Sequence, residues 1–127
     1  VFTFSMHGAH NYPFHKERSD LDIGLPDGKG EATYLSLLRE NLPALIERVR
    51  PDLACFLSGV DILQTDKCGK LNITPEGCSA RDETVFSLLK KRDIPCVVAM
   101  GGGYSHDIRD IVHAHCNTFK IAADVYA

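Results

Sequence analysis

Three short runs of apolar residues constrain the fold of this chain more than any other feature of its sequence. They cover residues 1–6, 52–57 and 95–100, and each is continuous rather than alternating. Continuous runs of this length are typical of β-strands that are covered on both faces, as in a parallel sheet packed between helices. The sequence therefore predicts three strands of this kind.

Amphipathic helical patterns separate the apolar runs. Residues 31–50 place apolar side chains three and four positions apart, which predicts one helix, and Pro43 is expected to bend its axis. Thr74 and Pro75 form a favourable helix start, with Thr74 as the N-cap of a helix that reaches about Arg92. A last helix is predicted to begin near Ser105. The side chains expected to align on one side of these helices are Tyr34, Leu37, Leu38, Leu42, Leu45, Ile46, Val49, Val85, Phe86, Leu88, Leu89, Ile108, Ile111, Val112 and His115.

Strands that alternate with helices imply right-handed crossovers and a parallel sheet. We therefore predict the α/β class, as a three-layer α/β/α arrangement with a mainly parallel sheet. Residues 1–127 show no repeat, low-complexity tract or linker, so we expect them to belong to a single domain. Residues 7–30 are predicted to form a long loop, and loops of that length in compact domains tend to be functional.

The composition excludes several classes of protein. With 44% apolar and 24% charged residues the chain is not disordered, and its net charge of −3 argues against a general nucleic-acid binder. No apolar stretch approaches the roughly 20 residues that cross a membrane, and no secretory signal opens the chain, so a soluble, cytoplasmic protein is expected. The five cysteines are scattered and should be reduced, with Cys55 and Cys96 buried in their apolar runs.

Polar and glycine residues follow each predicted strand, at the edge where parallel sheets bind ligands. Asp61 lies beyond the second strand, where a carboxylate could bind a metal, act as a base or cap the next turn, and spacing alone favours capping. Three glycines and Tyr104 follow the third strand, which indicates a sharp turn or a close backbone approach beside a hydroxyl donor. A plain turn or a phosphate loop stays open, but no Walker lysine supports nucleotide binding.

The six histidines do not by themselves form a recognisable metal site. His7, His10 and His15 share one loop without a fixed geometry, and His113 and His115 lie two positions apart on a predicted helix. No complete set of three zinc ligands can be assembled from these spacings.

Taken together, these segments resemble the C-terminal half of the histone deacetylase superfamily, the zinc-dependent amidohydrolases of the arginase/deacetylase fold. The resemblance spans nearly the whole chain. It rests on three ordered motifs, which are Phe4-Ser5-Met6-His7, Ser58-Gly59-Val60-Asp61 with Asp66 and Gly69, and Gly101-Gly102-Gly103-Tyr104. The segments around Tyr12 and residues 24–28 are more similar to bacterial and class IV-like members than to class I enzymes.

The resemblance implies a hydrolase that removes acetyl groups from lysine side chains. Asp61 matches the third zinc ligand of the family. Tyr104 matches the catalytic tyrosine, which polarises the amide carbonyl and stabilises the oxyanion. Gly102 and Gly103 would line the acyl-lysine tunnel, and Tyr12 falls near its aromatic residue.

Two further cation and substrate expectations follow from the same resemblance. Ser5 and Met6 match positions that bind a structural potassium or sodium ion in some relatives. The expected partners are an acetylated lysine peptide or another acylated amine, with no direct nucleic-acid or membrane partner.

The family's Asp-x-His ligand pair and tandem His-His base do not occur in these 127 residues. We therefore expect the chain alone to be inactive, and to expose surface that favours self-association. Two alternatives stay open. One is an amidohydrolase of the same superfamily that acts on acetylpolyamines or other small molecules, and the other is an α/β binding module without catalysis.

Overall fold

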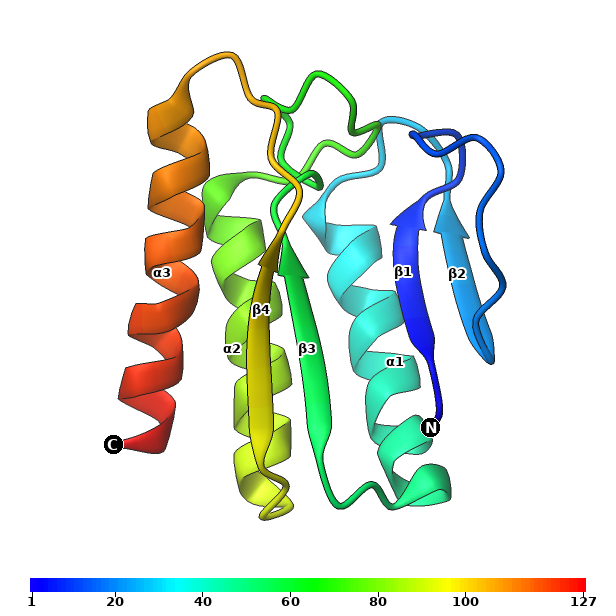
Figure 1. Cartoon of the computed structure of the whole chain (residues 1–127), viewed down its shortest axis with the longest axis vertical. Helices are drawn as coiled ribbons and strands as arrows, with labels where there is room; N and C mark the ends of the chain where they lie inside the picture. The colour runs from blue at the N-terminus through cyan, green and yellow to red at the C-terminus, as the bar shows by residue number, and fades with distance from the viewer.

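A computed structural model describes all 127 residues of the chain. Its elements in chain order are β1 (Phe4–Gly8), β2 (Leu21–Leu25), α1 (Glu31–Val49), β3 (Ala54–Gly59), α2 (Pro75–Lys91), β4 (Cys96–Gly101) and α3 (Ile108–Tyr126). Strands and helices alternate from β2 onward, and the predicted α/β class is confirmed (Figure 1). None of the three helices combines the length and apolarity that crossing a membrane requires.

The strands form two parallel pairs. β1 pairs with β2, and β3 pairs with β4, but no ladder joins the two pairs. All four strands point toward the same end of the molecule, where the connecting loops and the first turns of the helices gather (Figure 1). Groups that follow different strands are therefore delivered to one end, as expected for a parallel α/β fold.

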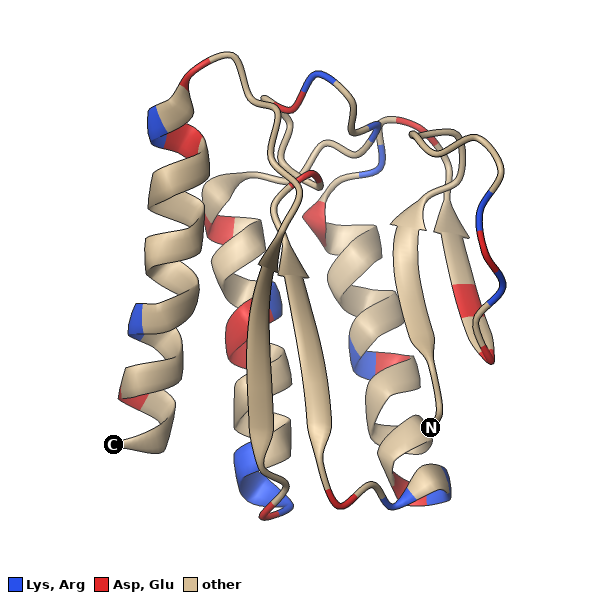
Figure 2. Cartoon of the chain, viewed as in Figure 1, with Lys and Arg blue, Asp and Glu red and all other residues tan.

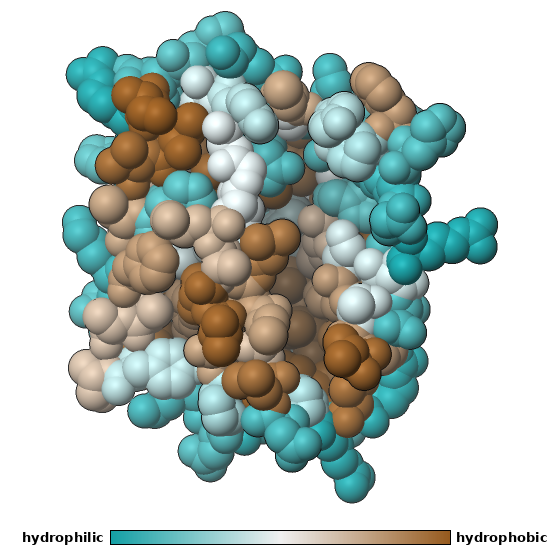
Figure 3. Space-filling view, viewed as in Figure 1, coloured by the Kyte–Doolittle hydropathy of each residue, from teal (hydrophilic) through white to brown (hydrophobic).

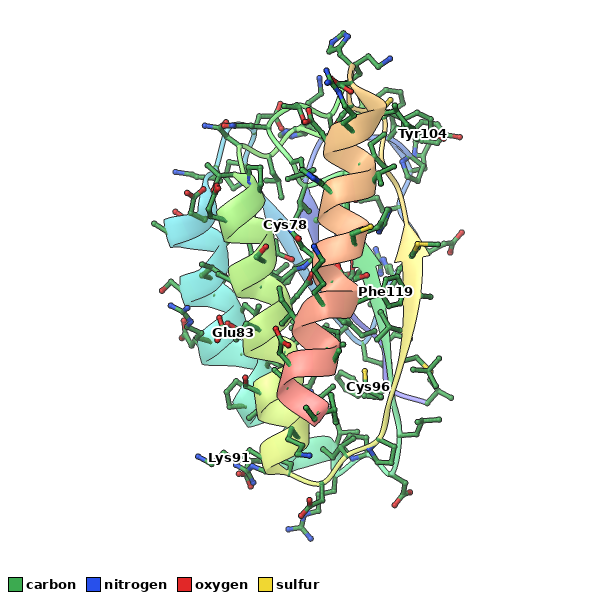
Figure 4. The ribbon with its side chains drawn as sticks, turned by 90° about the vertical axis from the view of Figure 1, so that its left-hand side faces the viewer. Cys78, Glu83, Lys91, Cys96, Tyr104 and Phe119 are labelled. Atoms are coloured by element: carbon green, nitrogen blue, oxygen red, sulfur yellow. The ribbon has the colours of Figure 1, made fainter.

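The three helices lie on one face of the strands, so these residues supply two of the three expected layers (Figure 4). On the other face Leu57 and Val97 are 68% and 54% exposed. Figure 3 shows apolar side chains on this face and a hollow between the two strand pairs. The predicted burial of Cys55 is wrong because its side chain points to this uncovered face, and Cys96 is half-buried. All five cysteines are free, as predicted.

The core lies between the strands and the helices, and the loop after β3 contributes to it. The predicted burial of Val85, Phe86 and Leu89 is confirmed. The core also contains a charged pair that the helical pattern did not indicate. Arg81 and Asp82 belong to α2 and are only 4% and 0% exposed. Figure 2 shows charged residues on α2 behind strands β3 and β4, which carry none.

The predicted long loop over residues 7–30 is wrong in part, because it contains β2. Leu21, Ile23 and Leu25 are more buried than the Asp22 and Gly24 between them, which is the alternation of a strand covered on one face. The strand forms because its backbone pairs with β1. The three predicted strands exist, but each begins one to three residues later than the apolar runs suggested, at residues 4, 54 and 96.

The helix starts follow the predicted capping chemistry closely. The Thr74 hydroxyl accepts a hydrogen bond from the Gly77 N–H at 3.0 Å, as expected for an N-cap. The last helix begins three residues later than predicted, after the N-cap Asp107. Its predicted inner face is wrong in part, because Ile108 and Val112 are exposed, whereas Ile111 packs against the core. Instead α3 packs on α2 through buried residues that include Thr118.

Candidate active site

A cavity of about 410 Å³ lies where β3 and β4 end. Four of the residues that the sequence singled out line it, together with two that it did not; the six are Asn11, Tyr12, Asp61, Cys68, Gly102 and Tyr104. The strand register explains this meeting. Gly59 of β3 lies opposite Gly101 of β4, so the segments that carry the carboxylate and the tyrosine leave the sheet side by side.

The Asp61 side chain fits between two glycines. A Cβ atom on Gly59 would lie 2.9 Å from Asp61 Oδ1, and one on Gly102 would lie 3.0 Å from the same oxygen. Gly102 also has a φ of +65°, a left-handed conformation that disfavours other residues. Position 102 therefore requires glycine both for the path of the backbone and for the space that the carboxylate occupies, whereas position 59 requires it for the space alone.

The electrostatic setting of Asp61 favours a nearby cation. Burial raises the pKa of the Asp61 carboxyl, and the neighbouring carboxylate of Asp66 adds to this effect, whereas a hydrogen bond from the backbone and the charge of Arg81 oppose it. A positive charge in the cavity would relieve the cost of the buried anion. The capping interpretation belongs instead to Asp66, whose Oδ1 accepts from the Cys68 and Gly69 amides at 2.8 and 2.7 Å.

Tyr104 lies at the carboxyl end of β4 with its backbone held and its side chain 61% exposed (Figure 4). Its N–H donates to Asp66 Oδ2 at 2.6 Å, and its carbonyl oxygen accepts from the Lys67 N–H at 3.1 Å. Both backbone groups are therefore engaged, while the phenol extends beside the cavity. A phenol in this position can donate a hydrogen bond to an oxygen that becomes negative during a reaction.

Of the remaining predicted site residues, one lines this cavity and the others do not. Tyr12 lines it and is 72% exposed, with Phe14 edge-on at 6.2 Å between ring centroids. Gly103 is not part of the lining; it packs against Val60 and Ile111, and its φ is +108°. The two residues expected to bind a monovalent cation lie inside β1 and do not line the cavity.

The hydroxyl of Ser5, one of these two β1 residues, is hydrogen-bonded to His7 Nδ1 at 2.8 Å. Burial lowers the pKa of His7, and the charge of Lys16 acts in the same direction.

Two lining residues were missed by the sequence analysis. Asn11 is 7% exposed, and its side-chain Oδ1 has no hydrogen-bond partner. A buried carbonyl oxygen without a donor is costly, so a substrate N–H that reached it would be favoured. Cys68 is exposed at the cavity and follows Asp66 closely. Their spacing in the sequence carries no signal, since they come together only through the loops that follow β1 and β3.

The donor groups at the cavity fit one part of a metal site. Asp61 offers carboxylate oxygens, which Zn²⁺ accepts alongside nitrogen and sulfur ligands. No group of three or more His, Cys, Asp or Glu side chains in the chain is arranged to hold a metal ion. These residues therefore supply one ligand for a zinc ion and do not complete its coordination.

Comparison with known proteins agrees with the motifs around this cavity. The model of the histone deacetylase domain matches residues 1–119. The chain belongs to the histone deacetylase family. The match includes the segments after β1, β3 and β4 that line the cavity, so the family assignment covers the whole candidate site.

The relatives of this histone deacetylase family chain include proteins of Picosynechococcus, Arabidopsis, Dictyostelium and Saccharomyces. An uncharacterized protein of Picosynechococcus sp. is 42% identical over 126 residues, covering 99% of this chain and 42% of that protein. Histone deacetylase 2 of Arabidopsis thaliana is 35% identical over 107 residues, covering 82% of this chain and 28% of the relative. The chain therefore spans well under half the length of both curated relatives.

A solved structure supports the same fold. The acetylpolyamine aminohydrolase from Burkholderia pseudomallei aligns with 98% of this chain and 38% of its own length, with a TM-score of 0.80. Its sequence identity to this chain is 22%, so the likeness shows a shared fold and does not transfer a substrate. The predicted arginase/deacetylase-type architecture is thus confirmed.

Proposed function

We propose that this chain is the C-terminal part of a zinc-dependent deacetylase domain that removes acetyl groups from lysine side chains. The observation that carries the proposal is the shared cavity of Asp61 and Tyr104 at the ends of two paired strands. A carboxylate that would bind a metal and a phenol that would stabilise an oxyanion are the chemical groups this reaction needs. An acetyl-lysine substrate is favoured because a relative with 35% identity is named a histone deacetylase.

In this proposal the chain's own residues bind and orient the acetyl group. The Tyr104 hydroxyl donates a hydrogen bond to the amide carbonyl oxygen and keeps that bond as negative charge develops on the oxygen. Gly102 lets the substrate approach closely because it has no side chain, and the Tyr12 ring flanks the aliphatic stem of the lysine. The Asn11 oxygen, which has no hydrogen-bond partner in the chain, accepts from the amide N–H of the substrate in this proposal.

A zinc ion bound beside Asp61 would supply Lewis-acid polarisation and a water activated at neutral pH. Asp61 would provide one ligand, and the other ligands and the general base would come from outside these residues. The chain by itself is therefore expected to be inactive. Ser5 and Met6 are proposed to help hold a structural potassium or sodium ion, with the Ser5 hydroxyl exchanging its His7 contact for the ion.

The deciding experiment uses the longest protein that contains this chain. Hydrolysis of an acetyl-lysine peptide is measured before and after chelation, after zinc is restored, and in a Tyr104→Phe variant. We expect chelation to abolish hydrolysis, zinc to restore it, and the variant to lower kcat by about 10²–10³-fold, as for loss of one oxyanion donor. Tyr126→Phe is the matched control, because that ring lies at the end of α3, away from the cavity.

The outcomes separate the alternatives. Full activity in Tyr104→Phe would refute the oxyanion role. Zinc-dependent hydrolysis of an acetylpolyamine in place of the peptide would move the assignment to a small-molecule amidohydrolase. A folded, zinc-loaded protein that binds but hydrolyses neither substrate would support a binding module.

A further inference from the structure

One carboxylate in the loop after β3 joins two segments of the candidate site. Asp66 is 8% exposed, and its carboxylate accepts three backbone hydrogen bonds. Its Oδ1 accepts from the Cys68 and Gly69 amides at 2.8 and 2.7 Å, and its Oδ2 accepts from the Tyr104 amide at 2.6 Å. Hydrogen bonds of this length to a carboxylate are the strong, charge-assisted kind.

The hydrogen bond from Tyr104 to Asp66 is one of several contacts between residues 65–67 and residues 104–105, which together we call the clamp. The Lys67 N–H donates to the Tyr104 carbonyl oxygen at 3.1 Å, and the hydroxyls of Thr65 and Ser105 are 2.8 Å apart. A short antiparallel bridge thus links Asp66 and its neighbours to the tyrosine segment, 38 residues later in sequence. The peptide of Tyr104 is held on both its donor and its acceptor side.

This clamp follows two consecutive glycines with positive φ. Gly102 and Gly103 have φ values of +65° and +108°, and glycine loses more conformational freedom on folding than any other residue. β4 therefore cannot by itself fix the direction of the tyrosine. The first strong restraint after the glycines is the Tyr104 amide on Asp66.

We propose that Asp66 is the positioning residue for Tyr104, holding the tyrosine peptide so that the phenol meets the substrate carbonyl; this rests on the proposed deacetylase function. Asp66 does not touch the substrate and acts through the tyrosine backbone. A displacement of about 1 Å at a reacting group costs roughly 10²-fold in rate. Loss of the clamp should therefore lower kcat with little effect on substrate binding.

The test is a double-mutant cycle in the longest protein that contains this chain, with an acetyl-lysine peptide as substrate. In Asp66→Asn one oxygen becomes an NH₂ group, so the side chain cannot serve both the turn amides and the Tyr104 amide. We expect kcat to fall at least 10-fold, with KM changed less than threefold. In the Tyr104→Phe background the same substitution should cost less than threefold, because the hydroxyl that it positions is already gone.

Asp107→Asn is the matched control. Asp107 also accepts a backbone N–H, from Arg109 at 2.9 Å, but it caps α3, and Asn serves equally well as an N-cap. This control should leave kcat within twofold of the wild-type value. An equal loss from Asp66→Asn in both backgrounds would show that Asp66 merely supports the fold and would overturn the proposal.

Hydrogen exchange of single amides tests the clamp without activity or metal. In the wild-type protein the Tyr104 amide should exchange at least 10-fold more slowly than that of Gly103, which makes no such bond. Asp66→Asn should remove that difference. A rapidly exchanging Tyr104 amide in the wild-type protein would refute the clamp even if the variant fails to fold. Absent hydrolysis with a protected amide would instead refute the proposed function and leave the clamp intact.

Discussion

Replacing Gly102 by alanine tests how tightly the glycine turn and the Asp61 carboxylate are packed together. The new Cβ would lie 3.0 Å from both Cβ and Oδ1 of Asp61 and 3.1 Å from its Cγ. On its other side Asp61 Oδ1 already lies against Gly59, 2.9 Å from where a Cβ of that residue would be, so the carboxylate has little room to move away from Gly102. The substitution therefore combines backbone strain with a steric conflict at the candidate metal ligand.

The two contributions can be separated with a matched control. Gly102 has a φ of +65°, where a residue with a Cβ costs about 1–2 kcal/mol. Overpacking of a filled site adds about 1–3 kcal/mol, so Gly102→Ala should lower the free energy of unfolding by about 2–5 kcal/mol. Gly28 has a similar φ of +75° and nothing within 4 Å of its Cβ position, so Gly28→Ala should show the backbone cost alone.

Urea unfolding of the two variants and the wild-type protein, followed by circular dichroism, measures both costs. The midpoint differences are interpretable provided that the slopes of the transitions agree. We expect Gly102→Ala to lose at least about 1 kcal/mol more than Gly28→Ala, the lower end of the overpacking cost. Equal losses would refute the conclusion that Asp61 is held against the glycine turn.

Two other predictions concern the core and the uncovered strand face. Arg81→Met should lower the free energy of unfolding by about 3–5 kcal/mol, because it leaves a buried carboxylate unpaired, and a loss below about 1 kcal/mol would contradict this. Arg109→Met, in an exposed ion pair, should change unfolding little in the same denaturation assay. We also expect the isolated chain to self-associate through the exposed β3–β4 face, as measured by light scattering during size exclusion. Leu57→Lys with Val97→Lys should restore the monomer, whereas Ser36→Lys on the exposed side of α1 should not, and a wild-type monomer at high concentration would refute the interface.

Local signals were sufficient for most of the secondary structure. The Thr74-Pro75 helix start and the stripe of residues 31–50 are confirmed because capping and helical periodicity act within a few residues of sequence. β2 was overlooked because five residues with one glycine carry too weak an alternation to stand out in a polar segment. Its stability comes from pairing with β1, which is a contact outside its own sequence.

The sequence predicted the two main residues of the candidate site but not the hydrogen bonds that hold them in place. Asp61 and Tyr104 follow apolar strands, so their place at one edge of the sheet could be anticipated. The clamp made by Asp66 could not, because its three acceptor contacts depend on where two loops cross. The orphaned Asn11 oxygen is likewise visible only when the loop after β1 is placed over the other strand ends.

The sequence by itself determined the α/β class, the helix starts, and the presence of a carboxylate and a tyrosine after two strands, because each depends on local conformational preference and burial pattern. The tertiary structure decided which strands pair, which acidic residue caps the loop and which charges are buried. It placed Arg81 and Asp82 inside the core, which the helical pattern did not indicate. Such choices depend on contacts between residues far apart in the chain, and their energies exist only once the backbone has brought those residues together.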